Sequence, residues 1–172
     1  MAVAPQPFLA GQRLTAGQLN DAVEKTLDSV DVAIAGVLAT TSGTTELNVS
    51  QFALGPVAVD TANLYKLAVR IIGSQTVATD EFFCRIRRDT PVTGTLIAEW
   101  VMYAPGTTAG FLFTSFADFV PSADNPAINY YLSVARAVGT GVLNVWGQLN
   151  NRNRSGDSIT RIGYAPQYRV VT

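Results

Sequence analysis

The apolar residues of the chain repeat with one spacing before about residue 40 and with another after it. Over residues 14–38, apolar side chains recur at alternating steps of four and three, which places them on one face of an α-helix. These side chains belong to Leu19, Val23, Leu27, Val30, Ile34 and Val37. Thr15, followed three residues later by Gln18, has the form of an N-terminal capping box. The pattern therefore predicts one long amphipathic helix over residues 14–38.

A heptad repeat within this helix predicts self-association. β-Branched valines fill its d positions, which disfavours a parallel dimer and favours three or four strands, while Asn20 at an a position fixes the register. The expected oligomerisation residues are Leu19, Asn20, Val23, Leu27, Val30, Ile34 and Val37. We therefore expect a homotrimeric stalk. The alternative is that the helix folds back onto a sheet of its own chain.

After residue 40 the hydrophobic period approaches two, which indicates strands. Leu67 and Val69, for example, alternate with Lys66 and Arg70. The expected strands cover residues 64–72, 82–88, 96–103, 111–119, 128–135, 142–149, 158–164 and 168–171, with weaker candidates at 47–54 and 57–59. Turn signals rich in Gly, Pro and Asn separate them. Many short strands joined by such turns predict an antiparallel β-sandwich of the jelly-roll kind.

These segments together predict a mainly β protein in which an N-terminal helix precedes the sandwich. Phe8 and Leu9 are the apolar residues of a short Pro-containing arm, and we expect them to attach the chain to a particle. The expected parts are an anchoring arm at residues 1–13, a helical trimerisation stalk at 14–40, a linker with the first strands at 41–60, and a β-sandwich head at 61–172.

Composition narrows the chemistry open to the chain. Its 172 residues include no histidine and one cysteine, so His-dependent nucleophilic pairs, His or Cys-cluster metal sites and an intrachain disulfide are not expected. A net charge of −1 with 15% charged residues gives no global field to recruit nucleic acid or an anionic membrane. Neither a signal peptide nor an apolar run of 18 residues is evident, so we expect synthesis in the cytoplasm without membrane insertion.

Four arginines are the candidate ligand-binding residues. Arg85 and Arg87 point the same way from one predicted strand, and Arg152 and Arg154 lie in the polar segment 150–157, which has the composition of an exposed loop tip. Arg85 and Arg87 could bind phosphate or a glycan, or they could be paired with nearby carboxylates on a solvated strand face. Arg152 and Arg154 could bind a partner, or they could belong to an ordinary polar loop tip.

Catalysis and a cofactor are not expected. Cys84 shares the apolar face of its predicted strand with Phe82 and Ile86, which favours packing in the core over a role as nucleophile. A glycosidase needs two carboxylates across one cleft. No spacing singles out a pair among the candidates Asp89, Glu99, Asp118 and Asp124. The strand aromatics Trp100, Tyr130, Tyr131 and Trp146 could stack on sugars, but a core or subunit interface suits them better.

Three segments resemble small virion proteins of phages that infect actinobacteria, usually described as minor tail or fibre proteins. FLAGQRLTAGQLND at residues 8–21 is similar to the opening of many of these proteins, and CRIRRDTPVTGTLIAEWVMY at residues 84–103 resembles their recurring β-domain. SITRIGYAPQYRVV at residues 158–171 is a looser match to their C-terminal strands. The resemblance implies a virion appendage whose N-terminal arm and trimeric stalk attach to the particle and whose β-sandwich head is directed outwards.

We therefore expect a structural, non-enzymatic protein of the virion, assembled in the host cytoplasm as a trimeric short fibre or a decoration subunit. Its expected partners are further copies of itself and capsid or tail proteins. The alternative is a receptor- or carbohydrate-binding module at a tail tip, which recognises a host cell-surface glycan by aromatic stacking. A glycan-degrading enzyme would need the paired carboxylates that the sequence does not single out.

Overall fold

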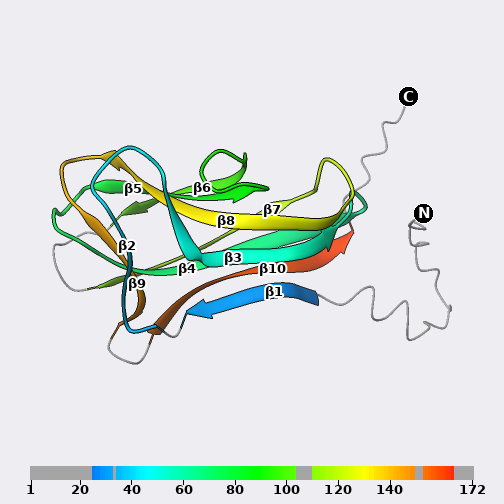
Figure 1. The fold of residues 1–172 in the computed structure, drawn as a ribbon, viewed down its shortest axis with the longest axis horizontal. Helices are drawn as coiled ribbons and strands as arrows, with labels where there is room; N and C mark the ends of the chain where they lie inside the picture. The colour runs from blue at the N-terminus through cyan, green and yellow to red at the C-terminus, as the bar shows by residue number, and fades with distance from the viewer. Residues whose placement is uncertain (1–24, 33, 104–109, 150–152, 165–172) are drawn as a thin grey trace, which may run out of the picture.

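The chain folds into a β-sandwich. The computed structural model describes residues 25–32, 34–103, 110–149 and 153–164, and these residues form ten strands and no helix. The strands are β1 (Lys25–Val32), β2 (Gly36–Thr41), β3 (Leu47–Val59), β4 (Asn63–Gln75), β5 (Glu81–Arg88), β6 (Thr95–Tyr103), β7 (Phe111–Phe119), β8 (Asn125–Val138), β9 (Leu143–Leu149) and β10 (Asn153–Tyr164). They make two antiparallel sheets that lie face to face (Figure 1).

The larger sheet has six strands and is centred on β4. One edge of β4 pairs with β7 along nearly its whole length. The other edge pairs first with β10 and then, towards Gln75, with β9. β1 continues the sheet beyond β10, and β2 continues it beyond β9. The smaller sheet has the strand order β3-β8-β5-β6.

The helix predicted for residues 14–38 is wrong wherever the structure describes that segment. Residues 25–32 are β1, and β2 begins at Gly36. The first part of the predicted helix, residues 14–24, lies outside the described residues. Because β1 and β2 belong to the larger sheet, these residues are part of the sandwich and do not form a helical stalk.

The helix prediction was wrong because Val30 fits both a helical repeat and a strand repeat of two residues. Val32 distinguishes the strand from the helix. It falls outside the apolar face of the predicted helix, yet it is only 5% exposed because β1 turns it into the core. β-Branched residues favour strands, and Gly36 has a φ of +126°, far from the helical region.

The segments with a period of two are confirmed as strands. Residues 111–119 are β7 as predicted, and β4, β5, β6, β8 and β9 begin and end within a few residues of the predicted bounds. The two weaker candidates are one strand, β3. The expected loop at residues 150–157 is wrong from Asn153 onward, where β10 begins and Ser155 and Asp157 are buried. The strand predicted at residues 168–171 lies outside the described residues.

Two clusters of buried side chains fill the space between the sheets. One includes Phe52, Ile71, Phe82, Leu132 and Leu143, and the other includes Leu54, Tyr65, Ile86, Tyr130 and Ile159. Cys84 is fully buried in the first cluster, which confirms the packing role expected for it. Burial, followed by the nearby charge of Asp157, raises the pKa of its thiol, so Cys84 is not a reactive nucleophile.

The two long sides of the sandwich differ. On one side β1 packs against β3, and the Gly55 backbone N–H donates a hydrogen bond of 2.6 Å to Asp28 Oδ2. On the other side lie the edge strands β6 and β7 (Figure 1). Within the described residues β6 pairs only with β5, and β7 pairs only with β4. This open side therefore leaves the outer edges of two strands without a strand partner.

Candidate interaction surface

The outer face of the larger sheet is organised in four rows of side chains that run across its strands. Residues paired directly in antiparallel strands share a face, so the strand register defines each row. The rows are Asp118, Lys66, Thr160 and Thr26; Phe116, Ala68, Ser158 and Ser29; Thr114, Arg70, Gly156 and Asp31; and Leu112, Ile72, Trp146 and Val37. In the two middle rows, the residues on β10 are small, Ser158 in one row and Gly156 in the other.

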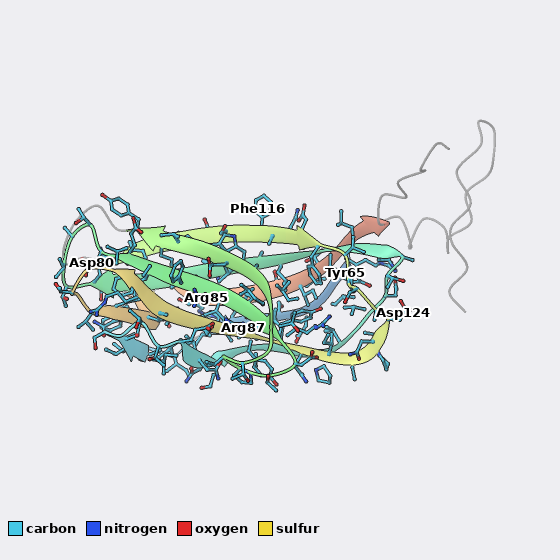
Figure 2. All side chains as sticks on the ribbon, turned by 90° about the horizontal axis from the view of Figure 1, so that it is seen from above. Tyr65, Asp80, Arg85, Arg87, Phe116 and Asp124 are labelled. Atoms are coloured by element: carbon cyan, nitrogen blue, oxygen red, sulfur yellow. The ribbon has the colours of Figure 1, made fainter. Side chains whose placement is uncertain are left out.

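A hollow of about 300 Å³ lies at these small residues. Ala68, Gly156, Ser158 and Ser29 line it because none of them has a side chain large enough to fill the space. Phe116 stands next to it, paired with Ala68 in the β7–β4 register and 62% exposed. Figure 2 shows Phe116 projecting from β7 away from the sandwich. The face therefore combines a projecting aromatic ring with a neighbouring depression.

Three paired charged side chains, Asp31, Arg70 and Arg154, lie at one end of the hollow. Asp31 accepts a hydrogen bond of 2.9 Å from an Arg70 guanidinium nitrogen, and an Arg154 guanidinium nitrogen lies 3.4 Å from its other oxygen. Arg70 also donates from Nε to the Arg154 carbonyl oxygen at 2.6 Å. All three side chains are about half exposed, so these ion pairs position the groups more than they stabilise the fold. The structure thus brings one candidate ligand-binding residue, Arg154, to the hollow.

Large apolar side chains remain exposed along the open side. Leu112 and Phe116 on β7 lie on the outer face of the larger sheet, with Val120 just after them. Leu96, Val101 and Tyr103 on β6 lie on the outer face of the smaller sheet. Single exposed hydrophobic residues are normal on a monomer, whereas groups of them mark sites of association. The open side and the outer face of the larger sheet, which meet at β7, are therefore the part of the described surface best suited to a protein partner.

The outer face of the smaller sheet carries a paired network around Glu46, whose side chain is only 8% exposed. Glu46 accepts hydrogen bonds from Arg87 Nη2 at 2.7 Å and from Ser133 Oγ at 2.5 Å, and Arg85 lies 3.6 Å away. Burial acts to raise the pKa of Glu46, but these hydrogen bonds and the arginine charges outweigh it and hold the pKa below its ordinary value.

The structure brings Arg85 and Arg87 together on β5 (Figure 2), and both are already paired. Arg85 Nε donates to Glu99 at 2.6 Å, and its guanidinium stacks over the Phe83 ring at 4.3 Å. A phosphate or glycan would have to compete with Glu46 and Glu99 for these groups. Ligand binding by Arg85 and Arg87 stays a prediction, and Arg152 lies outside the described residues.

Asp157 is the most perturbed carboxyl group in the described part of the chain. It points between the sheets from β10 and is 6% exposed, and its Oδ1 has no hydrogen-bond partner. Burial, with a smaller contribution from the charge of Asp28, raises its pKa to about 7. A shifted carboxyl can mark an active site when it sits in a cleft. Asp157 is among the residues that line the hollow, but it is buried, and its Oδ1 lies in the interior of the sandwich.

The other residues singled out from the sequence are dispersed. Leu27 and Val30 pack against the core, while Ile34 and Val37 are 58% and 45% exposed. Their role in oligomerisation stays a prediction, although not through a coiled coil. The remaining candidates Phe8, Leu9, Leu19, Asn20 and Val23 lie outside the described residues.

The carboxylates considered for catalysis do not converge. Asp89 lies beside Arg88 at 3.2 Å, Glu99 pairs with Arg85, and Asp124 accepts hydrogen bonds from the backbone and hydroxyl of Thr61. Over the described ranges, no three His, Cys, Asp or Glu side chains gather closely enough to hold a metal ion. Nor does that part of the chain contain a helix long and apolar enough to cross a membrane.

Comparisons with known proteins give a likeness of fold. No protein-family model and no curated protein matches the chain. Among solved structures, Eiger TNF from S. frugiperda has a TM-score of 0.50 at 11% identity, over 82% of this chain and 95% of that one. Particles derived from infectious bursal virus give 0.44 at 11% identity over 83% of this chain, and latent PorU from Porphyromonas gingivalis gives 0.49 at 8% identity over 80%.

The chain spans only 36% of that viral chain and 13% of PorU. Of these three likenesses, the one to Eiger TNF reaches a TM-score of 0.50, over 82% of this chain and 95% of that chain. At 11% identity it shows a shared β-sandwich fold and no shared activity. The chain is therefore an antiparallel β-sandwich of two sheets.

Proposed function

We propose that this chain is a structural, non-enzymatic subunit of a phage virion, assembled in the host cytoplasm into a multi-copy appendage such as a trimeric short fibre or a capsid decoration. The observation that carries the proposal is the group of exposed apolar side chains at the edge strands β6 and β7. Such a surface is costly in water and becomes favourable when a partner covers it.

The sequence supports the same role. Residues 8–21 and 84–103 resemble virion proteins of actinobacterial phages. Charged residues make up only 15% of the chain, which suits a protein whose surface is covered by neighbouring subunits. The N-terminal arm with Phe8 and Leu9 would contact a capsid or tail protein, and the sandwich would face outwards. Repetition of one subunit then multiplies weak contacts into stable attachment.

A non-enzymatic role agrees with the arrangement of the charged groups. Around the hollow and around Glu46, the carboxylates face guanidinium groups rather than each other. The carboxyl with the pKa best suited to proton transfer, Asp157, is buried in the sandwich. These carboxyl groups are therefore either paired with arginine or buried.

The test is whether the chain is part of the particle. Purified particles of the phage that encodes it are analysed by mass spectrometry and then labelled with gold-conjugated antibody. We expect a stoichiometric protein with labels at a fixed place on capsid or tail. A chain found only in the infected-cell lysate, and absent from particles washed free of it, would contradict the proposal.

One observation favours a second candidate, a receptor- or carbohydrate-binding module. The hollow presents the hydroxyls of Ser29 and Ser158 beside Asp31 and Arg70, with the Phe116 ring at its edge. Hydroxyl, carboxylate and guanidinium groups beside an exposed ring are the chemistry that binds a sugar. Glycan binding that is lost on replacing Phe116 with Ser would support this candidate.

A further inference from the structure

We infer that the outer face of the larger sheet is an interface between copies of this chain, in which Phe116 of one copy enters the hollow at Gly156 and Ser158 of the next. The inference rests on the proposed structural role and names the first partner in it, a second copy of the chain. It follows from the shapes and charges of two neighbouring features on one face.

The first support is size. The hollow measures about 300 Å³, and a cavity of about 150 Å³ is enough to hold a benzene molecule. A phenyl ring therefore fits with room for small adjustments. Phe116 is the most exposed large hydrophobic side chain that the structure describes, at 62%. Leu112, two rows away on the same strand, is 54% exposed and would be covered by the same contact.

The second support is that Phe116 does not fill the hollow of its own chain. β4 lies between β7, which carries Phe116, and β10, which carries Gly156 and Ser158. Side chains stand roughly perpendicular to a sheet whose strands are about 4.8 Å apart. The ring therefore projects from the edge of the face (Figure 2), and the hollow beside it stays open.

This arrangement has a consequence for symmetry. The ring and the hollow lie side by side on one face, so two copies related by a twofold axis can each place Phe116 in the hollow of the other. A heterologous arrangement, in which each copy inserts its ring into the hollow of the next, satisfies the same contacts when the copies close into a ring. We therefore expect a closed assembly of two or more chains.

The third feature of the contact is its charge. The Lys66 ammonium lies 5.3 Å from the centre of the Phe116 ring and accompanies it into the contact. Asp31 lines the hollow that receives the ring and is already paired with Arg70 and Arg154. Lys66 of one copy therefore meets a paired set of charges on the other, and the remaining groups, Ser29, Ser158 and Thr114, are uncharged.

The experiment measures the solution mass of the full chain by light scattering, with two variants that act on opposite halves of the contact. Phe116→Ser removes the ring, and Ser158→Trp fills the hollow. Val138→Ser is the matched control, because Val138 is also 58% exposed but lies on β8 of the smaller sheet. Circular dichroism and thermal unfolding verify that each variant is folded.

The wild type and Val138→Ser are expected to have at least twice the chain mass of 18.3 kDa, and both interface variants are expected to fall to 18.3 kDa. A monomeric wild type, or a large mass that persists in both folded interface variants, overturns the inference. Wild-type monomers that bind N-acetylglucosamine oligomers through Phe116 would assign the hollow to a sugar instead. Particle analysis is independent of these masses, so a monomer found in virions refutes this interface without refuting the structural role.

Discussion

Arg70 on β4 reaches Asp31 on β1 with a distance of 2.9 Å between nitrogen and oxygen, although β10 runs between these two strands. The two residues share a row with Gly156, which occupies the middle position on β10. Because Gly156 has no side chain, the Arg70 and Asp31 side chains can meet above its backbone, and the hollow lies beside this ion pair. One glycine thus permits both the tight approach of β1 and the depression on the face.

Replacing Gly156 with Ala should destabilise the fold. A Cβ at this position would collide with the backbone carbonyl oxygen of Val30. We expect β1 to be pushed away from β10 at a cost of about 1–3 kcal/mol, typical of overpacking. Denaturant unfolding measures the change, and faster amide exchange in β1 locates it. Gly43→Ala is the control because its Cβ would meet nothing closer than 3.8 Å, and equal losses in both variants would argue against the steric cause.

Asp157 should make the stability of the sandwich depend on pH. Its pKa of about 7 in the folded protein lies above the ordinary 3.8, so between these values the folded state holds a proton that the unfolded state has released. The contribution of this group to the free energy of unfolding therefore falls as pH rises from about 4 to 7, by at most about 4 kcal/mol.

Asp157→Asn removes this dependence and should be more stable than the wild type at pH 7, with the difference shrinking towards pH 4. Urea unfolding at several pH values measures it. Val138→Ser, which changes no ionisable group, should keep the wild-type slope. A difference between Asp157→Asn and wild type that does not change with pH would contradict the assignment.

Glu46→Gln should cost more stability than Glu99→Gln, although both carboxylates pair with Arg85. The Glu46 side chain is 8% exposed and also holds Arg87, so its loss leaves buried donors without a charged acceptor, at about 1–3 kcal/mol. The Glu99 side chain is 38% exposed, and its pair is worth less than about 1 kcal/mol. Thermal unfolding at pH 7 compares the two variants. Equal shifts would mean that Glu46 is effectively solvated.

Much of the sandwich could be predicted from alternation along the strands, because a half-buried strand must turn every second residue to the core. The same rule failed at residues 25–38, where Val30 and Val37 satisfy a helical repeat and only the burial of Val32 in the folded chain decides between the two. The polar neighbours of Asp157 predict a loop. Its burial depends on the partners β1 and β4, which local sequence does not reveal.

The interaction surface was only partly visible in the sequence. The segment FLFTSFADF carries aromatic residues on both faces of one strand, as residues 96–103 carry apolar ones, and this two-sided pattern indicates a second covered face. The hollow has no such signal. Ala68, Ser158 and Ser29 come from three distant segments, and only the register of β4, β10 and β1 brings them together.

Association of copies through the outer face of the larger sheet is tested most directly by a disulfide between them, in the double variant Lys66→Cys, Asp31→Cys, which keeps Phe116 and the small residues of the hollow. Within one chain these positions lie on β4 and β1, two strands or about 10 Å apart, beyond the reach of a disulfide, and the native Cys84 is buried. Mild oxidation should therefore link chains to one another on a non-reducing gel, whereas Asp31→Cys alone should remain unlinked. Double-variant chains that stay monomeric after oxidation would contradict the interface.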